Sequence, residues 1–286
     1  MGRTVSCAGL VVVVMLVGAA PASGMGKPRI AALQVGLRAH GVYPGTIDGH
    51  WGPATARGVT RLQRRAALTV DGVPGPATRR ALERLGRPLP GRRLLRTGRV
   101  GWDVSVTQFR LAWHGFPSGA LDGVYGPRTR AAVFRFQRHA GLRADGVVGP
   151  VTLAALRRPL TRFPISLRRP VRAAPGDPFG PRGNRFHTGL DYPAARGTVV
   201  RAAAGGRVVR AGWDSGGYGN VVVLGHGGRA RTWYAHLSGV RVRPGRAISA
   251  GAPVGRVGAT GHATGPHLHF EARVRGAAVD PLPALR

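Results

Sequence analysis

The chain has 286 residues, and its 43 lysines and arginines against 11 aspartates and glutamates give a formal net charge of +32. This length accommodates about two domains with hydrophobic cores of their own, and a hydrophobic content of 43% excludes wholesale disorder. The charge alone is compatible with a nucleic-acid partner, a hypothesis that needs a recognisable binding module to support it.

Residues 1–22 have the features of a secretory signal peptide. Arg3 supplies a positive charge, Leu10 to Val17 form an unbroken apolar run, and Ala20-Pro21-Ala22 offers small residues for cleavage before Ser23. The apolar run is shorter than the ~20 residues of a membrane-spanning helix, and no later segment approaches that length. We therefore expect a soluble, exported protein with no membrane span after signal removal.

The single cysteine, Cys7, lies inside this segment and ahead of its apolar run, whereas a lipoprotein cysteine follows the run. The expected mature chain then contains no cysteine. Disulfides, thiolate metal ligands and a cysteine nucleophile are excluded together, which leaves histidine, aspartate and glutamate for metal or acid–base chemistry.

The N-terminal half is a tandem repeat. A shift of 74 positions aligns Ile30–Glu83 with Val104–Arg157 without a gap, and 24 of the 54 aligned positions are identical. Each copy contains Asp-Gly followed by Gly-Pro twice, at residues 48–53, 71–76, 122–127 and 145–150. Proline at a first helical position favours helix initiation, and apolar residues at helical spacing follow. Each copy is therefore predicted to be a small three-helix domain.

Both copies resemble the peptidoglycan-binding domain found on many wall hydrolases. The motifs that carry the resemblance are Leu33-Gln34, Asp48-Gly49-x-Trp51-Gly52-Pro53-x-Thr55, Leu62-Gln63 and Asp71-Gly72-Val73 in the first copy, and Gln108, Asp122-Gly123, Tyr125-Gly126-Pro127-x-Thr129, Phe136-Gln137 and Asp145-Gly146 in the second. The resemblance implies binding domains over residues 28–86 and 102–158. The same residue types are also common in turns, at helix ends and in hydrophobic cores. The pattern therefore does not identify which residues contact a ligand.

Two basic segments connect the domains. Arg84–Arg99 and Arg157–Arg172 each contain six arginines, no acidic residue and several prolines. Such composition is typical of extended, solvated chain, so residues 87–101 and 159–174 are predicted to be linkers. Their charge also suggests attraction to anionic wall polymers, weakened by salt.

Residues 175–286 have a different pattern. Short runs rich in β-branched residues and broken by glycine occur at residues 197–202, 206–211, 220–224, 231–235, 255–258 and 267–271. Runs of four to six residues separated by turn residues predict an all-β, mostly antiparallel domain.

Six of the ten histidines lie between His187 and His269 in this domain. The pair His187-x-x-x-Asp191 offers an imidazole and a carboxylate, ligands that Zn²⁺ accepts, although this spacing alone is a weak signal. In a strand from His267 onward, alternation places His267, His269 and Glu271 on one face, which suits either a shared site or a solvated polar surface. His236 near the end of another predicted strand suits a catalytic or a purely structural role.

In combination these motifs resemble the M23 (LytM/lysostaphin-type) zinc metallopeptidases. They are Phe179-Gly180-Pro181-Arg182, Phe186-His187-x-x-x-Asp191, Tyr234-x-His236-Leu237-Ser238 and Gly258-x-x-Gly261-x-x-x-Gly265-Pro266-His267-Leu268-His269-Phe270-Glu271. The resemblance implies an M23 peptidase domain over residues 175–286.

By position, the resemblance implies Zn²⁺ bound by His187, Asp191 and His269, with His236 and His267 as catalytic histidines. Glu271 could orient one of the imidazoles. Pro181 and Arg182 occupy the region where staphylococcal members place a tyrosine, which argues against their glycyl-glycine specificity and leaves Arg182 as a candidate substrate contact.

The leading hypothesis is therefore a secreted, extracellular or wall-associated zinc endopeptidase that cleaves stem-peptide or cross-bridge amides of peptidoglycan. The alternative is a non-catalytic wall-binding protein or an activator of other wall hydrolases, against which the complete ligand set argues. A nucleic-acid partner is not expected, because the chain contains no nucleic-acid module and the segment 1–22 predicts export.

Overall fold

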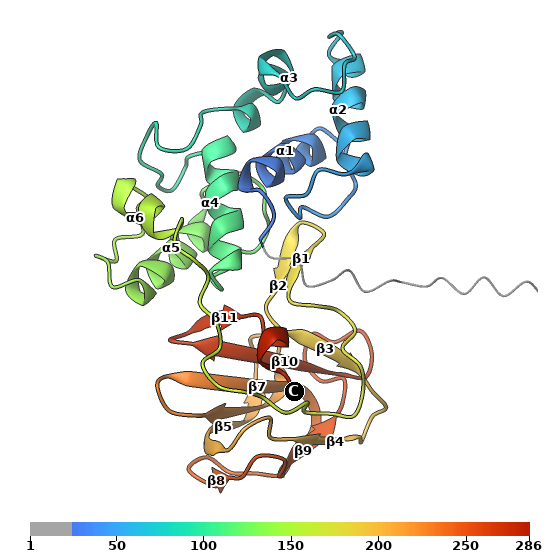
Figure 1. Ribbon diagram of the computed structural model, residues 1–286, viewed down its shortest axis with the longest axis vertical. Coiled ribbons are helices and arrows are strands. Elements are labelled where there is room, and N and C mark those ends of the chain that lie inside the picture. Colours follow the sequence, from blue (N-terminus) through green and yellow to red (C-terminus); the bar gives the residue numbers. More distant parts are fainter. Residues whose placement is uncertain (1–24) are drawn as a thin grey trace, which may run out of the picture.

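The computed structural model describes residues 25–286, which form a helical N-terminal part and a β-rich C-terminal part (Figure 1). The expected signal peptide, residues 1–22, lies outside the described residues. Within residues 25–286, no helix combines the length and the apolar character needed to cross a membrane. The sequence-based fold class is confirmed: six α-helices precede a mostly antiparallel sheet domain.

Each repeat forms three helices. They are α1 (Pro28–Ala39), α2 (Pro53–Arg65) and α3 (Pro76–Ala81) in the first repeat, and α4 (Trp102–Trp113), α5 (Pro127–His139) and α6 (Pro150–Ala155) in the second. Five of the six helices begin at a proline, whose missing N–H costs nothing at a first helical position. Helices α1 and α4 pack against each other, and Leu33, Leu37, Trp102 and Val106 share one buried cluster.

A buried glutamine stabilises each Asp-Gly turn of the repeats. The Nε2 of Gln137 donates to Asp145 Oδ1 at 2.9 Å and to Thr152 Oγ1 at 3.1 Å, and its Oε1 accepts from the Gly146 N–H at 2.9 Å. Gln34, Gln63 and Gln108 make the same contacts with their own turns. These repeat residues therefore have structural roles as turns, helix starts and core.

The C-terminal part contains one large antiparallel sheet and one hairpin. The strands are β1 (Gly180–Arg182), β2 (Arg185–His187), β3 (Leu190–Pro193), β4 (Val199–Arg201), β5 (Gly206–Asp214), β6 (Gly219–Gly225), β7 (Ala230–Val240), β8 (Ala247–Ile248), β9 (Pro253–Val257), β10 (His267–Val274) and β11 (Ala277–Val279). The main sheet has the order β11-β10-β7-β6-β5-β8, with β3 paired to β10, and with β9 paired to both β4 and β7. All six predicted strand runs are observed, whereas β1, β2, β3, β8 and β11 were not predicted.

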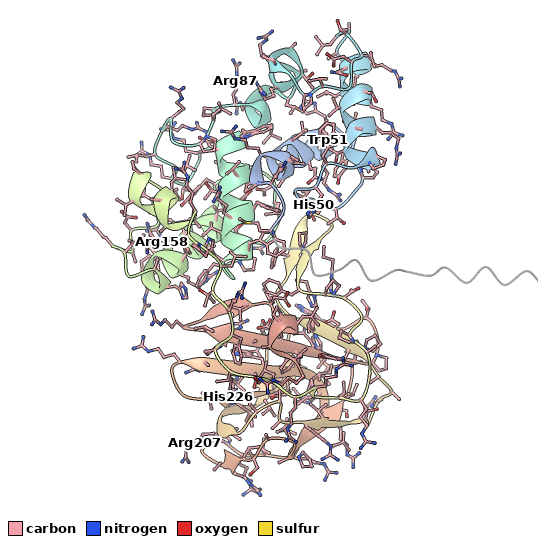
Figure 2. The ribbon with its side chains drawn as sticks, in the orientation of Figure 1. His50, Trp51, Arg87, Arg158, Arg207 and His226 are labelled. Atoms are coloured by element: carbon pink, nitrogen blue, oxygen red, sulfur yellow. The ribbon has the colours of Figure 1, made fainter. Side chains whose placement is uncertain are left out.

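Hairpin β1–β2 joins the sheet domain to both repeats, and in Figure 1 it extends from the sheet toward the helices. The backbone N–H of Ile47 donates to Gly183 O at 2.8 Å, and that of Leu121 donates to Asn184 O at 2.7 Å. Ile47 and Leu121 are equivalent positions of the two repeats. His50, on the loop before α2, lies beside this hairpin (Figure 2). The two repeats thus hold the hairpin tip through equivalent backbone donors.

The two basic connectors are not solvated throughout, contrary to expectation. Leu95 is buried and forms an antiparallel bridge with Val148 of the second repeat. The second connector crosses the β domain (Figure 1), and Phe163, Leu167 and Val171 enter its core. In the second connector all six arginines are exposed while these apolar residues pack inward, a division that overall composition conceals. In the first connector Arg93 pairs with the buried Asp103, and Leu89 and Leu94 stay exposed.

Candidate metal centre

Three side chains converge where β2, β3 and β10 meet. His187 Nε2 lies 3.0 Å from Asp191 Oδ1 and 3.0 Å from His269 Nδ1, and His269 Nδ1 lies 2.8 Å from Asp191 Oδ1. The strand register explains this arrangement, because His269 on β10 is paired directly with Asp191 on β3. Both imidazoles are buried and the carboxylate is partly buried.

The outer nitrogen of each imidazole already has an acceptor. His187 Nδ1 lies 2.8 Å from Pro178 O, and His269 Nε2 lies 3.0 Å from Glu271 Oε1. When these nitrogens carry the protons, His187 Nε2 and His269 Nδ1 present lone pairs to each other and to the Asp191 carboxylate. Three acceptors this close repel one another unless a proton or a metal ion lies between them. Despite burial, Asp191 and Glu271 raise the pKa of His269 to about 9 in the metal-free protein, so this ring can carry such a proton. Two imidazoles and a carboxylate that converge in this way also fit a metal ion.

The charges around Asp191 keep this carboxylate ionised. Burial opposes ionisation, but in the metal-free centre the contacts with His187 and His269 outweigh it and hold the pKa of Asp191 well below its usual range. Arg182 Nη2 contacts the second oxygen, Oδ2, at 2.9 Å and also contacts Asp177 at 2.9 Å. Arg182 thus lies at the centre, where it contacts an acidic residue of the donor set.

Glu271 connects His269 to a buried polar network. Its Oε1 accepts from Thr188 Oγ1 and, at 2.9 Å, from Tyr218 Oη, while Oε2 accepts from Arg273 Nε. Although burial opposes ionisation, Arg273 and His269 hold the pKa of Glu271 well below its usual range. A charged Glu271 therefore fixes the orientation and tautomer of His269.

Two further histidines flank the donor set. The rings of His236 and His267 have centroids 4.8 Å apart, and His236 lies 5.8 Å from His269. His236 Nδ1 lies 2.8 Å from Thr260 O, and His267 Nδ1 lies 2.9 Å from Gly265 O. Each ring thus donates Nδ1–H to a backbone carbonyl and keeps Nε2 free; His267 Nε2 is 3.8 Å from Asp191 Oδ1.

His236 has a left-handed backbone conformation, with φ of 60°. This region is unfavourable for a side chain with a Cβ and recurs at functional sites. The loop beneath it is tightly packed: a Cβ added to Gly261 would lie 2.4 Å from Gly217 O. Burial lowers the pKa of His236 to about 4, with the neighbouring His269 and His267 contributing. At neutral pH its imidazole is therefore neutral.

The structure brings all five sequence-predicted residues together, namely His187, Asp191, His236, His267 and His269. Sequence reasoning did not single out Thr188, Tyr218 and Arg273, the partners of Glu271. Arg273 continues the alternation of His267, His269 and Glu271 along β10, a signal that could have found it. Tyr218 gave no such signal, because it reaches the centre from a glycine-rich turn.

Comparisons with known proteins assign families to both parts of the chain. Residues 185–281 match peptidase family M23, and residues 26–82 and 101–156 each match the putative peptidoglycan binding domain.

The DD-carboxypeptidase/endopeptidase Mpg of Neisseria meningitidis is 46% identical over 111 residues, which are 37% of this chain and 25% of that protein. Lysostaphin of Staphylococcus simulans is 40% identical over 114 residues, which are 38% of this chain and 23% of that protein. The solved catalytic domain of the same lysostaphin is 37% identical, with a TM-score of 0.37, and the match covers 39% of this chain and 90% of that one. This chain thus spans about a quarter of the length of these two curated relatives.

Proposed function

Because residues 185–281 form a peptidase family M23 domain and two peptidoglycan-binding domains precede it, we propose that the protein is a secreted, zinc-dependent peptidoglycan endopeptidase. The observation that carries the proposal is the donor set of His187, Asp191 and His269, whose three ligand atoms converge on one point as a metal site needs. Relatives described as endopeptidases, Mpg among them, support the class of reaction.

In this proposal His187, Asp191 and His269 hold Zn²⁺. When bound, Zn²⁺ makes water nucleophilic near neutral pH and polarises a scissile carbonyl. Two imidazoles and one carboxylate are a common catalytic zinc set, and three protein ligands leave a position open. Arg182 and Glu271 hold the outer atoms of Asp191 and His269, so both ligands are oriented before the metal arrives.

His236 and His267 perform the proton transfers in this proposal. Each presents a free Nε2 toward the centre, because its Nδ1 is bound to a backbone carbonyl. One of the two accepts the proton of the attacking water and returns it to the leaving amine, while the other, when protonated, stabilises the oxyanion. His236 is neutral at neutral pH, so its Nε2 is available as a proton acceptor.

The binding domains hold the enzyme on its polymeric substrate. We propose the bounds 28–86 and 102–158 for the binding domains and 175–286 for the peptidase domain. Two modules on one chain raise the effective concentration of the peptidase at the wall, so weak individual affinities suffice. Export through residues 1–22 would bring the protein to this substrate.

The test is mass spectrometry of fragments released from purified peptidoglycan. We expect new pairs of amino and carboxyl termini within stem peptides or cross-bridges, and the fragment masses identify the cleaved bond. The His236→Ala variant should bind the same peptidoglycan without releasing fragments. Wall binding by the unaltered, zinc-loaded protein without any new termini would contradict the proposal and favour a non-catalytic wall-binding or activating role.

A further inference from the structure

A strongly basic groove lies between the second repeat and the sheet domain. It has a volume of about 700 Å³ and is formed by α5, the loop between β6 and β7, and the ends of β7 and β10. Figure 1 shows α5 next to the β10–β11 end of the sheet. Six arginines line it: Arg135, Arg138, Arg229, Arg231, Arg273 and Arg275. No acidic residue is part of the lining.

The charge of this groove is largely uncompensated. Arg273 pairs with the buried Glu271, but within residues 25–286 the side chains of the other five arginines make no hydrogen bond or ion pair. Burial and the nearby charge of Arg273 lower the pKa of Arg135. Like charges gathered without counter-charges repel one another, so an anionic ligand would stabilise the groove.

Two of the arginines occupy backbone positions that ordinarily favour glycine or asparagine. Arg229 has φ of 61° and Arg275 has φ of 50°, and the N–H of Arg275 donates to Arg229 O at 3.1 Å. Arginine is strained in this left-handed region. The two turns thus place two arginines in the lining of the groove in spite of a local conformational cost.

The groove lies on the same face of the sheet as the metal centre. His269, Glu271 and Arg273 alternate along β10, and Arg231 on β7 is paired with Arg273. Four residues of extended strand span about 13 Å, so a polymer bound at Arg273 is held about that far from the donor set. The arginines and the donor set therefore share one face of β10, with the buried Glu271 between them.

We propose that this groove binds a polyanion whose charges are phosphodiesters, specifically a polyol-phosphate polymer of the cell wall. Planar guanidinium groups form paired hydrogen bonds with phosphate oxygens, and six of them along one groove fit a polymer with repeated phosphates better than a single anion. That the polymer comes from the cell wall rests on the proposed function. That the groove binds a polyanion rests on the arginines that line it. Under this proposal, the attraction to anionic wall polymers arises at this groove and not at the two connectors.

The repeat supplies a matched control for testing this proposal. Arg61 and Arg64 on α2 are the equivalents of Arg135 and Arg138 on α5, are also exposed, and lie outside the groove. The doubly substituted proteins Arg135→Gln/Arg138→Gln and Arg61→Gln/Arg64→Gln therefore carry the same net charge. A third protein, Arg229→Gly/Arg275→Gly, removes two guanidinium groups while relieving the backbone strain.

The experiment measures binding of a defined poly(glycerol phosphate) to the metal-free protein by calorimetry, so that hydrolysis plays no part. We expect binding to weaken about tenfold or more in both groove variants, because each loses two charge-assisted contacts, and by less than about twofold in the Arg61→Gln/Arg64→Gln control. Equal losses in groove and control variants would overturn the proposal, since they indicate a delocalised charge effect. Tighter binding of a carboxylate polymer of equal charge, or of anionic lipid vesicles, would overturn the assigned ligand.

Discussion

At the level of single residues, Glu271 is the principal support of the candidate centre. It is fully buried, yet it stays ionised through Arg273, His269, Thr188 and Tyr218. A buried carboxylate with this many partners holds His269 in one tautomer and one orientation. The position of the Nδ1 lone pair of His269 therefore depends on a residue that does not itself contact the other donors.

Replacing Glu271 by glutamine should weaken zinc binding by about 10- to 100-fold, the usual effect of losing such a supporting partner. The amide removes the negative charge that stabilises the Nε2–H of His269, and Arg273 loses its counter-charge. Competition with a chromophoric chelator measures the affinity. Thr188→Val, which removes one neutral hydrogen bond to the same oxygen, should cost less. Unchanged affinity in a normally folded Glu271→Gln protein would refute this role.

His236 should show an unusual proton equilibrium in the metal-free protein. Burial lowers its pKa from 6.5 to about 4, so the folded state takes up the proton less readily than the unfolded state. Stability is then unaffected above about pH 6.5 and falls as the pH drops from about 6.5 toward 4. NMR titration of the imidazole should give a midpoint near 4, and His236→Gln should flatten the pH dependence of the urea midpoint. A midpoint near 6.5 would be inconsistent with the burial of this ring.

The five candidate site residues were predictable because each lies in a short motif that can be recognised from the sequence without knowledge of the fold. The network around Glu271 was only partly predictable. Alternation along β10 places Glu271 and Arg273 on the side of His269, but it does not reveal that Tyr218 and Thr188 close the network. Those contacts depend on the packing of two segments, 53 and 83 residues away from Glu271 in sequence, against β10.

Among the structural elements, hairpin β1–β2 joins the repeats to the metal centre. Its tip accepts hydrogen bonds from both repeats, and its second strand ends at His187. Trp113 at the end of α4 packs against Phe179 and Phe186, with ring centroids 6.2 and 5.3 Å away. The orientation of a candidate metal ligand is therefore coupled to a helix of the second repeat.

Truncating Trp113 to alanine should destabilise the protein by about 3 to 5 kcal/mol, the usual cost of removing a large buried aromatic side chain. Denaturant unfolding monitored by circular dichroism measures the loss. Trp51→Ala is the matched control, because that tryptophan is 45% exposed on the first repeat (Figure 2) and its truncation should change stability by less than about 0.5 kcal/mol. A similarly small change in the free energy of unfolding at both positions would show that Trp113 does not connect the second repeat to the sheet domain.

The elements that sequence reasoning predicted are those determined by local signals. Asp-Gly turns, helix-starting prolines and alternating strands act over a few residues, so the repeats and six strands followed directly. Hairpin β1–β2 and the inward packing of Phe163, Leu167 and Val171 depend on surfaces contributed by distant segments. In the second connector, the arginines concealed apolar residues that are buried against the β domain.

At the scale of the whole molecule, one hydrophobic cluster crosses from the repeats into the sheet domain. Val35, Ile47, Phe109 and Trp113 belong to the same buried cluster as Leu190 and Phe270. The parts expected to bind the wall and to cleave it therefore share a core. This arrangement fixes the basic groove and the donor set on one sheet, so a polymer held by the repeats lies in a defined position relative to the candidate catalytic residues.

The central claim is that a metal held by His187, Asp191 and His269 drives amide hydrolysis in peptidoglycan. Its most direct test is a titration of metal-free protein with Zn²⁺ in which bound zinc and the release of amino groups from purified peptidoglycan are measured together. Activity should be absent without metal, rise in proportion to bound zinc and level off at about one equivalent. His269→Ala should bind little zinc and release no amino groups. Hydrolysis at the full rate by protein without bound zinc would contradict the account.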